Sequence, residues 1–505
     1  MARQYITTAI DYPNAAPHMG HVMEKVLADV VARWFRLRGD SVRFQIGTDE
    51  HGVKIERKAK DEGITPQALV DRNVPLYIDL YQRLQISSDV FIRTTDQKRH
   101  WPTVQALWKK LIAEKVLEKR TYTGLYCAGC ERFMTTRDLV DGKCQIHNAV
   151  PEKVSEENYF FLLGKETKWL KDLLTKKGGY HIVPGVRAQE TLSLIESGLE
   201  DVSFSRPKSS LSWGIPVPDE PEHVMYVWCD ALTNYISGLG FFTKNEERQW
   251  WDEATVTHVI GKDIARFHAL IWPAMLKHAG VRTPDRLLIH GFLTSEGQKM
   301  SKSIGNVVMP DEVLQKFNGN ADPLRFYLSH EVPVGNDGDF SWKRIEELYD
   351  AALRNKIGNL LNRVLVLLKK EDGTLVDCGK DSVGNVWQTY EGAMNDFRLA
   401  DAVQEALKIA VGANEYIDAR KVWALPADEK KAELSNLAER LRHLSLLLLP
   451  FIPQTAQEIS RQLGVPYAEK MLEKDFVITP AMKKWGGQKD WKKVGEPRIL
   501  FAPLS

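Results

Sequence analysis

The sequence predicts an α/β protein in which a doubly wound parallel sheet is split by an insertion and followed by an α-helical bundle. Three observations support this. Short apolar runs alternate with stretches of helical periodicity over residues 1–118. The alternation stops over residues 119–220, which contain a cysteine cluster, and it resumes over residues 221–325. Beyond residue 326 the strand patterns give way to long amphipathic segments.

The first part of the chain supplies most of the expected sheet. The predicted strands are Tyr5–Ile10, Val42–Ile46 and Val90–Ile92, then Val224–Trp228, Thr257–Ile260 and Leu287–Ile289. The expected helices include an amphipathic one over His21–Val31, for which Pro17 suits the start, and another over Trp101–Leu117.

The last part of the chain reads as helices. They are expected at Trp342–Lys370, Val386–Tyr416, Ala427–Leu449 and Pro453–Leu463, and a short closing strand is expected at Arg498–Pro503. We therefore place a linker region at residues 326–355 and a helical domain at residues 356–505.

Bulk composition limits the class of protein. At 505 residues the chain is too long for one core. Its hydrophobic content of 43% and charged content of 27% are ordinary for a globular protein. The net charge of +1 shows no overall basicity, although a local positive stripe would suffice to bind RNA. The chain shows no signal peptide, and its longest apolar run, Leu444–Pro453, is too short to span a membrane, so we expect a cytoplasmic protein.

One motif, Pro17-His18-Met19-Gly20-His21, follows the first strand and opens the first helix. A helix N-terminus offers unpaired N–H groups and partial positive charge, which suits a phosphate. His18 and His21 lie on one face of the first turn and can donate hydrogen bonds to phosphate oxygens. Gly20 has no Cβ, so we expect adenine or phosphate to approach the backbone there. The alternative is a pair of surface histidines at a helix cap.

A second motif, Lys299-Met300-Ser301-Lys302-Ser303, follows a strand and an expected turn over residues 295–298. A mobile loop carrying Lys299 and Lys302 could close over a triphosphate and neutralise the leaving pyrophosphate. A solvated basic loop is the alternative, but the first motif argues against it.

The cysteines favour a metal site over disulfides, because the chain has five of them and three cluster. Cys127 and Cys130 form one pair of ligands with a two-residue spacer, and Cys144 and His147 form another. Two such pairs complete a tetrahedral structural zinc site, so we expect one Zn²⁺ per chain. Cys229 and Cys378 are expected to be small buried hydrophobic residues.

Together the motifs resemble those of the class I aminoacyl-tRNA synthetases, and among these the enzymes for methionine. The two motifs correspond to the family's HIGH and KMSKS sequences, and further landmarks are Thr48–Gly52, Arg93–Asp96, Trp213–Pro218, Tyr226–Ala231 and Ile260–Asp263. The resemblance implies a Rossmann-like catalytic domain in two halves, a zinc-knuckle insertion, a stem-contact linker and an anticodon-binding bundle.

The resemblance also implies the reaction. Methionine's carboxylate attacks the α-phosphate of ATP, pyrophosphate leaves with Mg²⁺, and the methionyl group passes to the 2′-hydroxyl of the terminal adenosine of tRNA(Met). The implied ATP-binding residues are His18, Gly20, His21, Lys299, Ser301 and Lys302, and the two histidines and two lysines are implied to be catalytic.

The family's substrate pocket corresponds to Ile10, Tyr12, Asp49, Trp228, Ala231, Tyr235, Ile264 and His268. Asp49 is implied to bind the ammonium of methionine, Tyr235 and Ile10 to touch sulfur, and Trp228 to form a wall. Ile271 stands where the family often has an aromatic residue and Leu232 where it often has proline, so both could alter the pocket. The implied readers of the CAU anticodon are Asn359, Arg363 and Trp423. Some members carry a further dimerising domain that this chain lacks, which favours a monomer.

Three other functions remain open. Small nucleotidylyltransferases share the His-x-Gly-His helix but lack the split sheet and the helical third. Synthetases for leucine, isoleucine or valine would need a much larger editing insertion than the roughly 100 residues here. A synthetase-like tRNA-binding protein without catalysis is a third possibility, although all four charged motif residues are present. Exchange of labelled pyrophosphate into ATP with each amino acid would separate these options.

Overall fold

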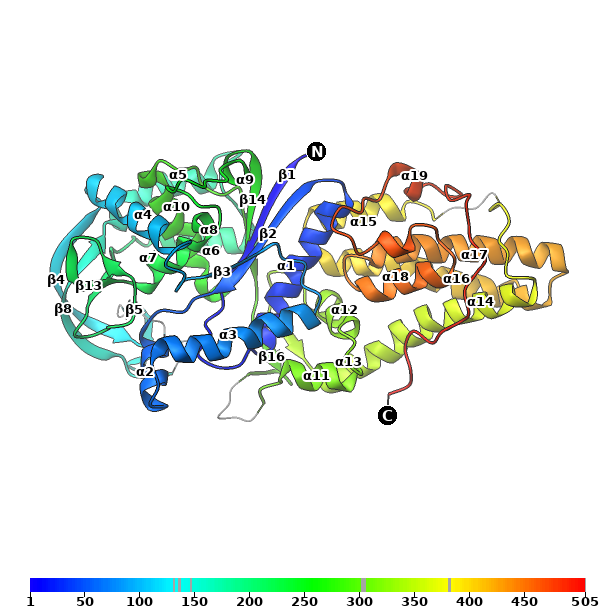
Figure 1. Cartoon of the computed structure of the whole chain (residues 1–505), viewed down its shortest axis with the longest axis horizontal. Helices are drawn as coiled ribbons and strands as arrows, with labels where there is room; N and C mark the ends of the chain where they lie inside the picture. The colour runs from blue at the N-terminus through cyan, green and yellow to red at the C-terminus, as the bar shows by residue number, and fades with distance from the viewer. Residues whose placement is uncertain (130–131, 135–137, 146–147, 301–305, 380–382, 505) are drawn as a thin grey trace.

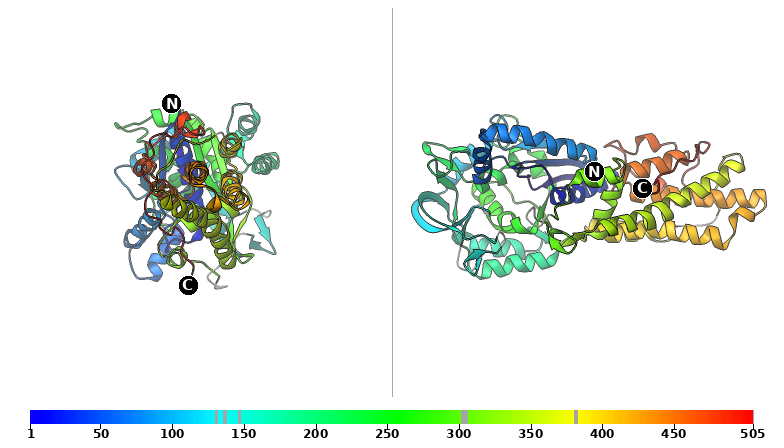
Figure 2. Two further views of the ribbon diagram at one scale, coloured as in Figure 1. Left: turned by 90° about the vertical axis from the view of Figure 1, so that its right-hand side faces the viewer. Right: turned by 90° about the horizontal axis from the view of Figure 1, so that it is seen from below.

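The structure is a computed structural model that describes residues 1–504 except 130–131, 135–137, 146–147, 301–305 and 380–382. The molecule is elongated, with an α/β part at one end and a helical part at the other (Figure 1). Helix α1 lies where the two parts meet. The turned views of Figure 2 show the yellow and orange helices extending away from the sheet. None of the described helices is long and apolar enough to cross a membrane.

A parallel sheet of six described strands forms the centre of the α/β part, which confirms the expected fold class. Its strands, in spatial order, are β3 (Val90–Arg93), β2 (Ser41–Thr48), β1 (Arg3–Thr8), β14 (Ala254–Gly261), β15 (Arg286–His290) and β9 (His181–Val183). All neighbouring pairs run parallel. Strand β9 comes from within residues 119–220, so the predicted insertion contributes one strand to the parallel sheet.

Helices cover this sheet. They are α1 (Met19–Leu37), α2 (Val53–Asp61), α3 (Pro66–Arg83), α4 (Trp101–Ala113), α5 (Thr167–Thr175), α6 (Gly185–Glu196), α7 (Val227–Leu232), α8 (Asn234–Ser237), α9 (Gln249–Asp252) and α10 (Trp272–Ala279), with the π-helical turn η4 (Phe267–Ile271) before α10. Helix α4 ends four residues before the predicted Leu117, because Leu117 begins a strand of the insertion.

Helix α1 differs from the amphipathic surface helix that the sequence predicts. Residues 22–32 are buried all round, including the charged Glu24, Lys25 and Asp29. The helix packs against β1, β2 and β14 on one side and against α12 (Asp322–Glu331) on another. Burial of charged groups requires partners, and the structure supplies them: Lys25 contacts two carboxylates and Asp29 pairs with Arg325.

The insertion is built mainly of antiparallel strands. One sheet joins β10 (Val202–Ser203), β8 (Glu152–Phe161), β4 (Leu117–Cys127) and β5 (Arg132–Met134), and β6 (Leu139–Val140) pairs with β7 (Lys143–Cys144). A further sheet joins β11 (Ser205–Pro207), β13 (Glu220–Met225) and β12 (Pro216–Val217). The predicted parallel strand Val224–Trp228 is therefore wrong, because β13 ends at Met225 in this antiparallel sheet and Trp228 lies on α7.

The sheet domain continues with β16 (Leu293–Ser295), β17 (Gln298–Lys299), α11 (Pro310–Lys316), α12 and β18 (Gly338–Phe340). The helical part then follows with α13 (Trp342–Leu348), the π-helix η5 (Tyr349–Gly358), α14 (Asn359–Lys370), α15 (Val386–Asn395), α16 (Leu399–Ala419), α17 (Ala427–Leu448), α18 (Pro453–Gln462) and α19 (Pro480–Lys483). This confirms the predicted helical domain.

Three details of the helical part differ from the prediction. The segment Val386–Tyr416 is two helices, because Phe397 adopts a left-handed backbone with a φ of 59°. The segment Trp342–Lys370 contains a π-helical stretch in its middle. The end of the chain forms no strand within the described residues. Instead Phe501 is buried against Tyr349, whose hydroxyl donates to Ala502 O at 2.7 Å.

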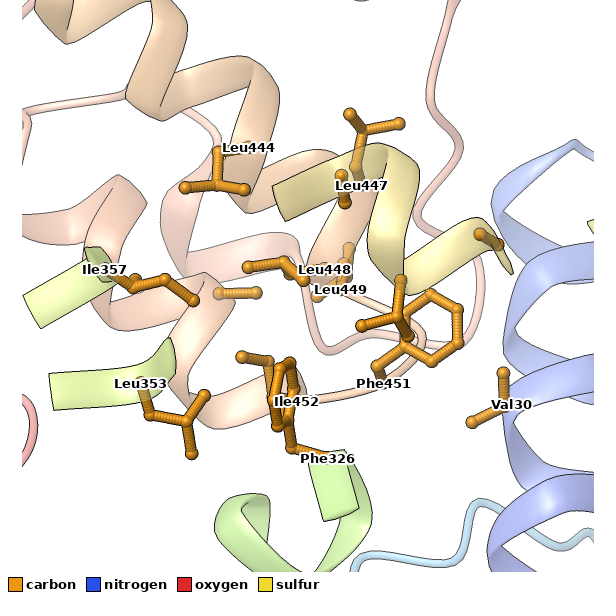
Figure 3. Packing of buried hydrophobic residues seen from close by; sticks show 14 of the residues in the cluster. Val30, Phe326, Leu353, Ile357, Leu444, Leu447, Leu448, Leu449, Phe451 and Ile452 are labelled. Atoms are coloured by element: carbon orange, nitrogen blue, oxygen red, sulfur yellow. The ribbon is translucent and has the colours of Figure 1, made fainter. Parts of the chain in front are cut away.

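A single apolar cluster joins the two parts of the molecule. Figure 3 shows Val30 of α1 and Phe326 of α12 beside Phe451 and Ile452, which follow α17. Leu353 and the leucines of α17 complete the view. Burial of this much apolar surface holds the helical domain against the helix that carries the first motif.

Candidate active site

A cavity of about 600 Å³ opens at the carboxyl ends of β1, β14 and β15. Ligands of open α/β sheets bind at this edge. The cavity is lined by the predicted first-motif residues His18, Gly20 and His21 and by the predicted pocket residues Ile10, Tyr12, Asp49, Trp228, Ala231, Tyr235, Ile264 and His268. Segments far apart in sequence thus meet around one space, as the sequence predicts.

The two motif histidines cap helix α1, which begins at Met19 rather than at Pro17. The Gly20 N–H donates to His18 Nδ1 at 3.1 Å, and the His18 N–H donates to His21 Nδ1 at 3.1 Å. Each Nδ1 therefore acts as an acceptor, so each neutral ring carries its proton on Nε2. Burial, His18 and Lys25 lower the pKa of His21 well below its usual value, which keeps that ring neutral. The His21 ring is therefore neutral, and the cap places the N–H donors of both rings on their outer nitrogens.

Gly20 serves the cap directly. A Cβ at this position would come within 3.0 Å of His18 Cε1 and 3.1 Å of its Nδ1. This is tighter than ordinary van der Waals contact, so the missing side chain makes room for the His18 ring. The sequence analysis expected that space for a nucleotide, and the imidazole occupies part of it. The rings of His18 and His21 are stacked with centroids 3.8 Å apart.

On the opposite side, Tyr235 and His268 form a fixed pair. His268 Nδ1 lies 3.0 Å from Ile264 O, which can only accept, so Nδ1 carries the proton. Its Nε2 then accepts from the Tyr235 hydroxyl at 2.6 Å. Burial lowers the pKa of His268 to about 4, so the ring is neutral at physiological pH. The hydroxyl proton of Tyr235 is committed to His268, and its oxygen lone pairs remain for other contacts.

Trp228 forms a wall of the cavity together with a residue that the sequence analysis missed. Its ring is stacked on Phe267 with centroids 3.6 Å apart and planes inclined by 8°. Phe267 belongs to η4, directly before His268, and its position next to a predicted pocket residue was the available signal. The stack gives the cavity a flat aromatic side.

A buried network fixes the loop that bears Asp49. The Asp230 carboxylate, on α7 between Trp228 and Ala231, lies 2.6 Å from His51 Nδ1 and 2.7 Å from His100 Nε2. Burial opposes its charge, but the two histidines hold the pKa of Asp230 below its usual value. Tyr12 donates to His51 O at 2.7 Å. Tyr12, the loop that bears Asp49 and the helix that bears Trp228 are therefore connected through His51 and Asp230.

Charged residues that the sequence analysis did not single out also line the cavity. They are Asp11, Glu24, Lys54, Asp263, Arg266 and His290. Burial raises the pKa of Asp263 above its usual value. Asp263 belongs to the landmark Ile260–Asp263, whereas the sequence pattern places Glu24 and Lys25 at ordinary positions of an amphipathic helix. Only their burial sets them apart.

The second motif is described in part. Strands β16 and β17 form a hairpin whose turn residues, Glu296 and Gly297, have φ of 50° and 75°, which confirms the predicted turn. Met300 lines the cavity next to this hairpin. The backbone of Lys299 ends β17, and Ser301 and Lys302 lie outside the described residues.

The two departures from the family pattern lie on different surfaces. Leu232 lines the main cavity, whereas Ile271 lines a second cavity of about 450 Å³ between the insertion and η4. Phe267 and Arg266 border both spaces. Leu232 can therefore shape the main cavity directly, and Ile271 can act on it through η4.

The structure describes two of the four predicted metal ligands. Cys127 and Cys144 are buried in one small cluster with Met134, and Cys130 and His147 lie outside the described residues. The Asn148 N–H donates to Cys144 O at 2.8 Å. Cys229 is buried, as expected, whereas Cys378 is only partly buried and its thiol contacts Ser435 O at 3.7 Å.

The residues predicted to read the anticodon lie on the helical part. Asn359 is exposed at the start of α14, and Arg363 follows one turn later. The Arg363 guanidinium pairs with Asp418 and lies 5.9 Å from the centre of the Trp423 ring. Trp423, in the turn η6 (Val422–Ala424), is 46% exposed. The structure thus brings Arg363 and Trp423 together on a solvent-facing surface.

Comparison with known proteins identifies the class. The family of class I tRNA synthetases (M) matches residues 4–145 and 130–365, and the anticodon-binding domain of tRNA ligases matches residues 383–495. The chain therefore belongs to the class I aminoacyl-tRNA synthetases.

Its relatives are specific for one amino acid. The methionine–tRNA ligase of Caldanaerobacter subterraneus is 40% identical over 98% of this chain and 78% of its own length, and that of Brucella suis is 39% identical over 95% of each. Mycobacterium tuberculosis methionyl-tRNA synthetase in complex with methionyl-adenylate superposes with a TM-score of 0.88 at 34% identity, covering 99% of this chain and all of that one. This chain is accordingly a methionine–tRNA ligase, an ATP-dependent enzyme.

Proposed function

We propose that the 600 Å³ cavity is where methionine and ATP form methionyl-adenylate, with the amino acid against Tyr235 and the nucleotide against the α1 cap. One observation carries this assignment: eleven predicted residues from distant segments line one space. Similarity to a relative solved in complex with methionyl-adenylate, with a TM-score of 0.88, supports it.

On the nucleotide side, the cap supplies neutral donors. The Nε2–H groups of His18 and His21 would bond phosphate oxygens as negative charge develops in the in-line attack on the α-phosphate. Lys299, Ser301 and Lys302 would hold the pyrophosphate from the other motif, with Mg²⁺ bound to its oxygens. The carboxylates of Glu24 and Asp263 suit the ribose hydroxyls of ATP, which are donors.

On the amino-acid side, an apolar and aromatic wall of the cavity would recognise the side chain of methionine. The Trp228–Phe267 stack and Ile10 suit an apolar, polarizable thioether. Because the Tyr235 proton is committed to His268, the hydroxyl is held at a fixed position beside the substrate side chain. Asp49 would pair with the substrate ammonium. Ala231, Ile264 and Tyr12 complete the pocket.

For the second half of the reaction we propose that the methionyl group passes to the terminal 2′-hydroxyl of tRNA(Met), selected through its anticodon. Trp423 is exposed enough to stack on an unpaired base, and Arg363 beside it can contact a base edge. Asn359 lies one turn away on the same helix. The domain boundaries given by the sequence analysis, the monomeric state and the cytoplasmic location stay predictions.

A structural Zn²⁺ is part of the proposal. Cys127 and Cys144 lie in one buried cluster although 17 positions apart, as ligands of one ion must, and Cys130 and His147 would complete the tetrahedron. Elemental analysis of the purified protein should give one zinc per chain, and Cys144→Ser should lower that content. A zinc-free, fully active preparation would remove the metal from the proposal.

The central experiment is methionine-dependent exchange of pyrophosphate into ATP. The wild-type enzyme should exchange with methionine, and Tyr235→Ala should raise the KM for methionine more than the KM for ATP. An equal rise of both would contradict the division of the cavity into two sides.

A further inference from the structure

A group of buried charges lies at the base of the cavity, where the loop after β1 crosses helix α1. Lys25 Nζ is 2.7 Å from Asp11 Oδ1, 2.9 Å from Glu24 Oε1 and 3.0 Å from Ala9 O. The side chains of Lys25, Asp11 and Glu24 are 0%, 4% and 8% exposed. An ammonium has three N–H groups, and each here has an acceptor. The hydrogen-bonding capacity of the Lys25 ammonium is therefore filled.

Other elements close the cluster. From α3, the Tyr81 hydroxyl donates to Asp11 Oδ2 at 2.6 Å, and burial together with the Asp11 charge raises the pKa of Tyr77. From the end of β15, His290 Nε2 lies 3.2 Å from Glu24 Oε2. Across the cavity, the Glu24 charge also acts on the pKa values of Asp263, His268 and Tyr235.

Lys25 is the central positive charge between two carboxylates. Burial raises the pKa of Asp11 to about 6 although Lys25 opposes the change. Burial also disfavours the charge on Glu24, but Lys25 and His290 hold the pKa of that carboxyl below its usual value. Without the ammonium, two carboxylates would face each other in a low-dielectric site and at least one would take up a proton.

The same ammonium connects the two sides of the catalytic cavity. Ala9 and Asp11 flank Ile10 and precede Tyr12, which we place on the methionine side. Glu24 lies one helical turn after His21, which we place on the nucleotide side. A bond from Lys25 to each group fixes the distance between them.

We propose that Lys25 is a positioning residue for adenylate formation. Its buried ammonium sets the spacing between the Ile10–Tyr12 loop and the His18–His21 turn, and it keeps the Glu24 carboxylate ionised at the cavity wall. This inference rests on the proposed assignment of the cavity. A purely structural ion pair would instead affect stability and leave the kinetics of the folded enzyme unchanged.

The first test compares Lys25→Met with Lys277→Met. Lys277 pairs with Glu166 at 2.6 Å on α10, outside the cavity, so its loss is a matched control for the removal of a lysine–carboxylate pair. Methionine-dependent pyrophosphate exchange is measured from pH 5.5 to 9, with thermal unfolding recorded for each protein. Lys25→Met should lower kcat/KM for both substrates by about 100-fold, because small displacements of reacting groups are costly.

The pH dependence of kcat/KM distinguishes a positioning role of Lys25 from a purely structural one. Removing the positive charge raises the pKa values of Asp11 and Glu24, so the acidic limb of Lys25→Met should move to higher pH by about one unit or more. The limb of Lys277→Met should coincide with that of the wild type. A folded Lys25→Met enzyme with a wild-type profile and kcat/KM within about twofold of wild type would overturn the proposal.

A second variant keeps the test decisive if Lys25→Met does not fold. Asp11→Asn removes the group with a pKa of about 6 and leaves Lys25 paired with Glu24, so the acidic limb should move to lower pH. The double variant Asp11→Asn/Lys25→Met removes the repulsion between carboxylates and should return the limb toward that of the wild type. An unchanged limb in Asp11→Asn would contradict the inference. A wild-type enzyme that shows no methionine-dependent exchange would instead refute the proposed function.

Discussion

The proposed catalytic cavity and the proposed anticodon-binding surface present their recognition groups in opposite ways. In the cavity Tyr235 and His268 are 1% and 2% exposed, and their protons are assigned by buried partners. On the helical part Trp423 is 46% exposed. Chemistry requires groups that are fixed before the substrate arrives and shielded from water. Reading an unpaired base requires an aromatic plane that a large partner can reach.

The two regions are nevertheless joined by a buried ion pair and by hydrogen bonds. Asp29 of α1 pairs with Arg325 of α12 at 2.7 Å, and both side chains are fully buried. Arg325 also donates to Pro450 O at 3.0 Å and to Phe451 O at 2.9 Å in the helical part. The helix that carries His18 and His21 is thereby fixed to the domain that carries Trp423. Separate assays are needed to tell the contributions of the two regions apart.

The largest effect is expected in the catalytic region. Lys302→Ala should slow adenylate formation by about 100- to 1,000-fold, because the charge that it is proposed to stabilise develops in the transition state. The methionine dissociation constant should change little. Pyrophosphate exchange and equilibrium binding of methionine measure the two quantities. Lys343→Ala, on the exposed face of α13, is the control. An equal loss of binding and rate would contradict the proposed role.

A variant in the helical part tests the proposed anticodon-binding surface. Trp423→Ala should lower kcat/KM for tRNA charging by about 10- to 100-fold, because stacking on a base contributes about 1–3 kcal/mol. Pyrophosphate exchange should stay at the wild-type rate. Trp423→Phe keeps an aromatic plane and should retain most of the activity. Unchanged charging by Trp423→Ala would remove the anticodon assignment.

A variant with a smaller expected effect tests whether the cavity is pre-organised. Tyr235→Phe leaves His268 Nε2 without its donor, so kcat/KM for methionine should fall by about tenfold. Tyr180→Phe is the matched control, since its hydroxyl donates to the backbone of the same His268 at 3.2 Å. If both variants lose the same activity, the bond from the Tyr235 hydroxyl to His268 Nε2 has no specific role in methionine recognition.

The smallest effect concerns pH. The pKa of His268 is about 4 in the folded protein and about 6.5 in the unfolded chain, so the unfolded state binds more protons between these values. Stability from the neutral ring is therefore present above about pH 6.5 and lost as the pH falls toward 4. His268→Gln should reduce the pH dependence of the unfolding free energy in this window by about 1–3 kcal/mol. Denaturant titrations from pH 4 to 7 measure it, and an unaltered slope would show that the ring is not held neutral.

Local patterns were sufficient to predict the architecture. Apolar runs predicted β1, β2, β3, β14 and β15 to within a few residues, and helical periodicity predicted α1, α14, α17 and α18. The first motif predicted His18, Gly20 and His21, because the chemistry of histidine and glycine at a helix start depends on adjacent positions, whereas the other predicted cavity residues are implied only by the family resemblance. The cap that places the proton of His18 on Nε2 also involves only residues 18–21.

Tertiary structure decided what depends on distant partners. Val224–Met225 joined an antiparallel sheet, and Trp228 a helix, because their neighbours are segments of the insertion. Glu24 and Lys25 lie at ordinary helical positions, yet they became buried because the loop after β1, helix α3 and the end of β15 pack against them. Glu24 meets His290 across 266 positions, and Trp228 meets Phe267 across 39. Sequence periodicity reports which residues prefer burial, whereas the partner that a buried charge or ring finds is fixed only when the whole chain packs.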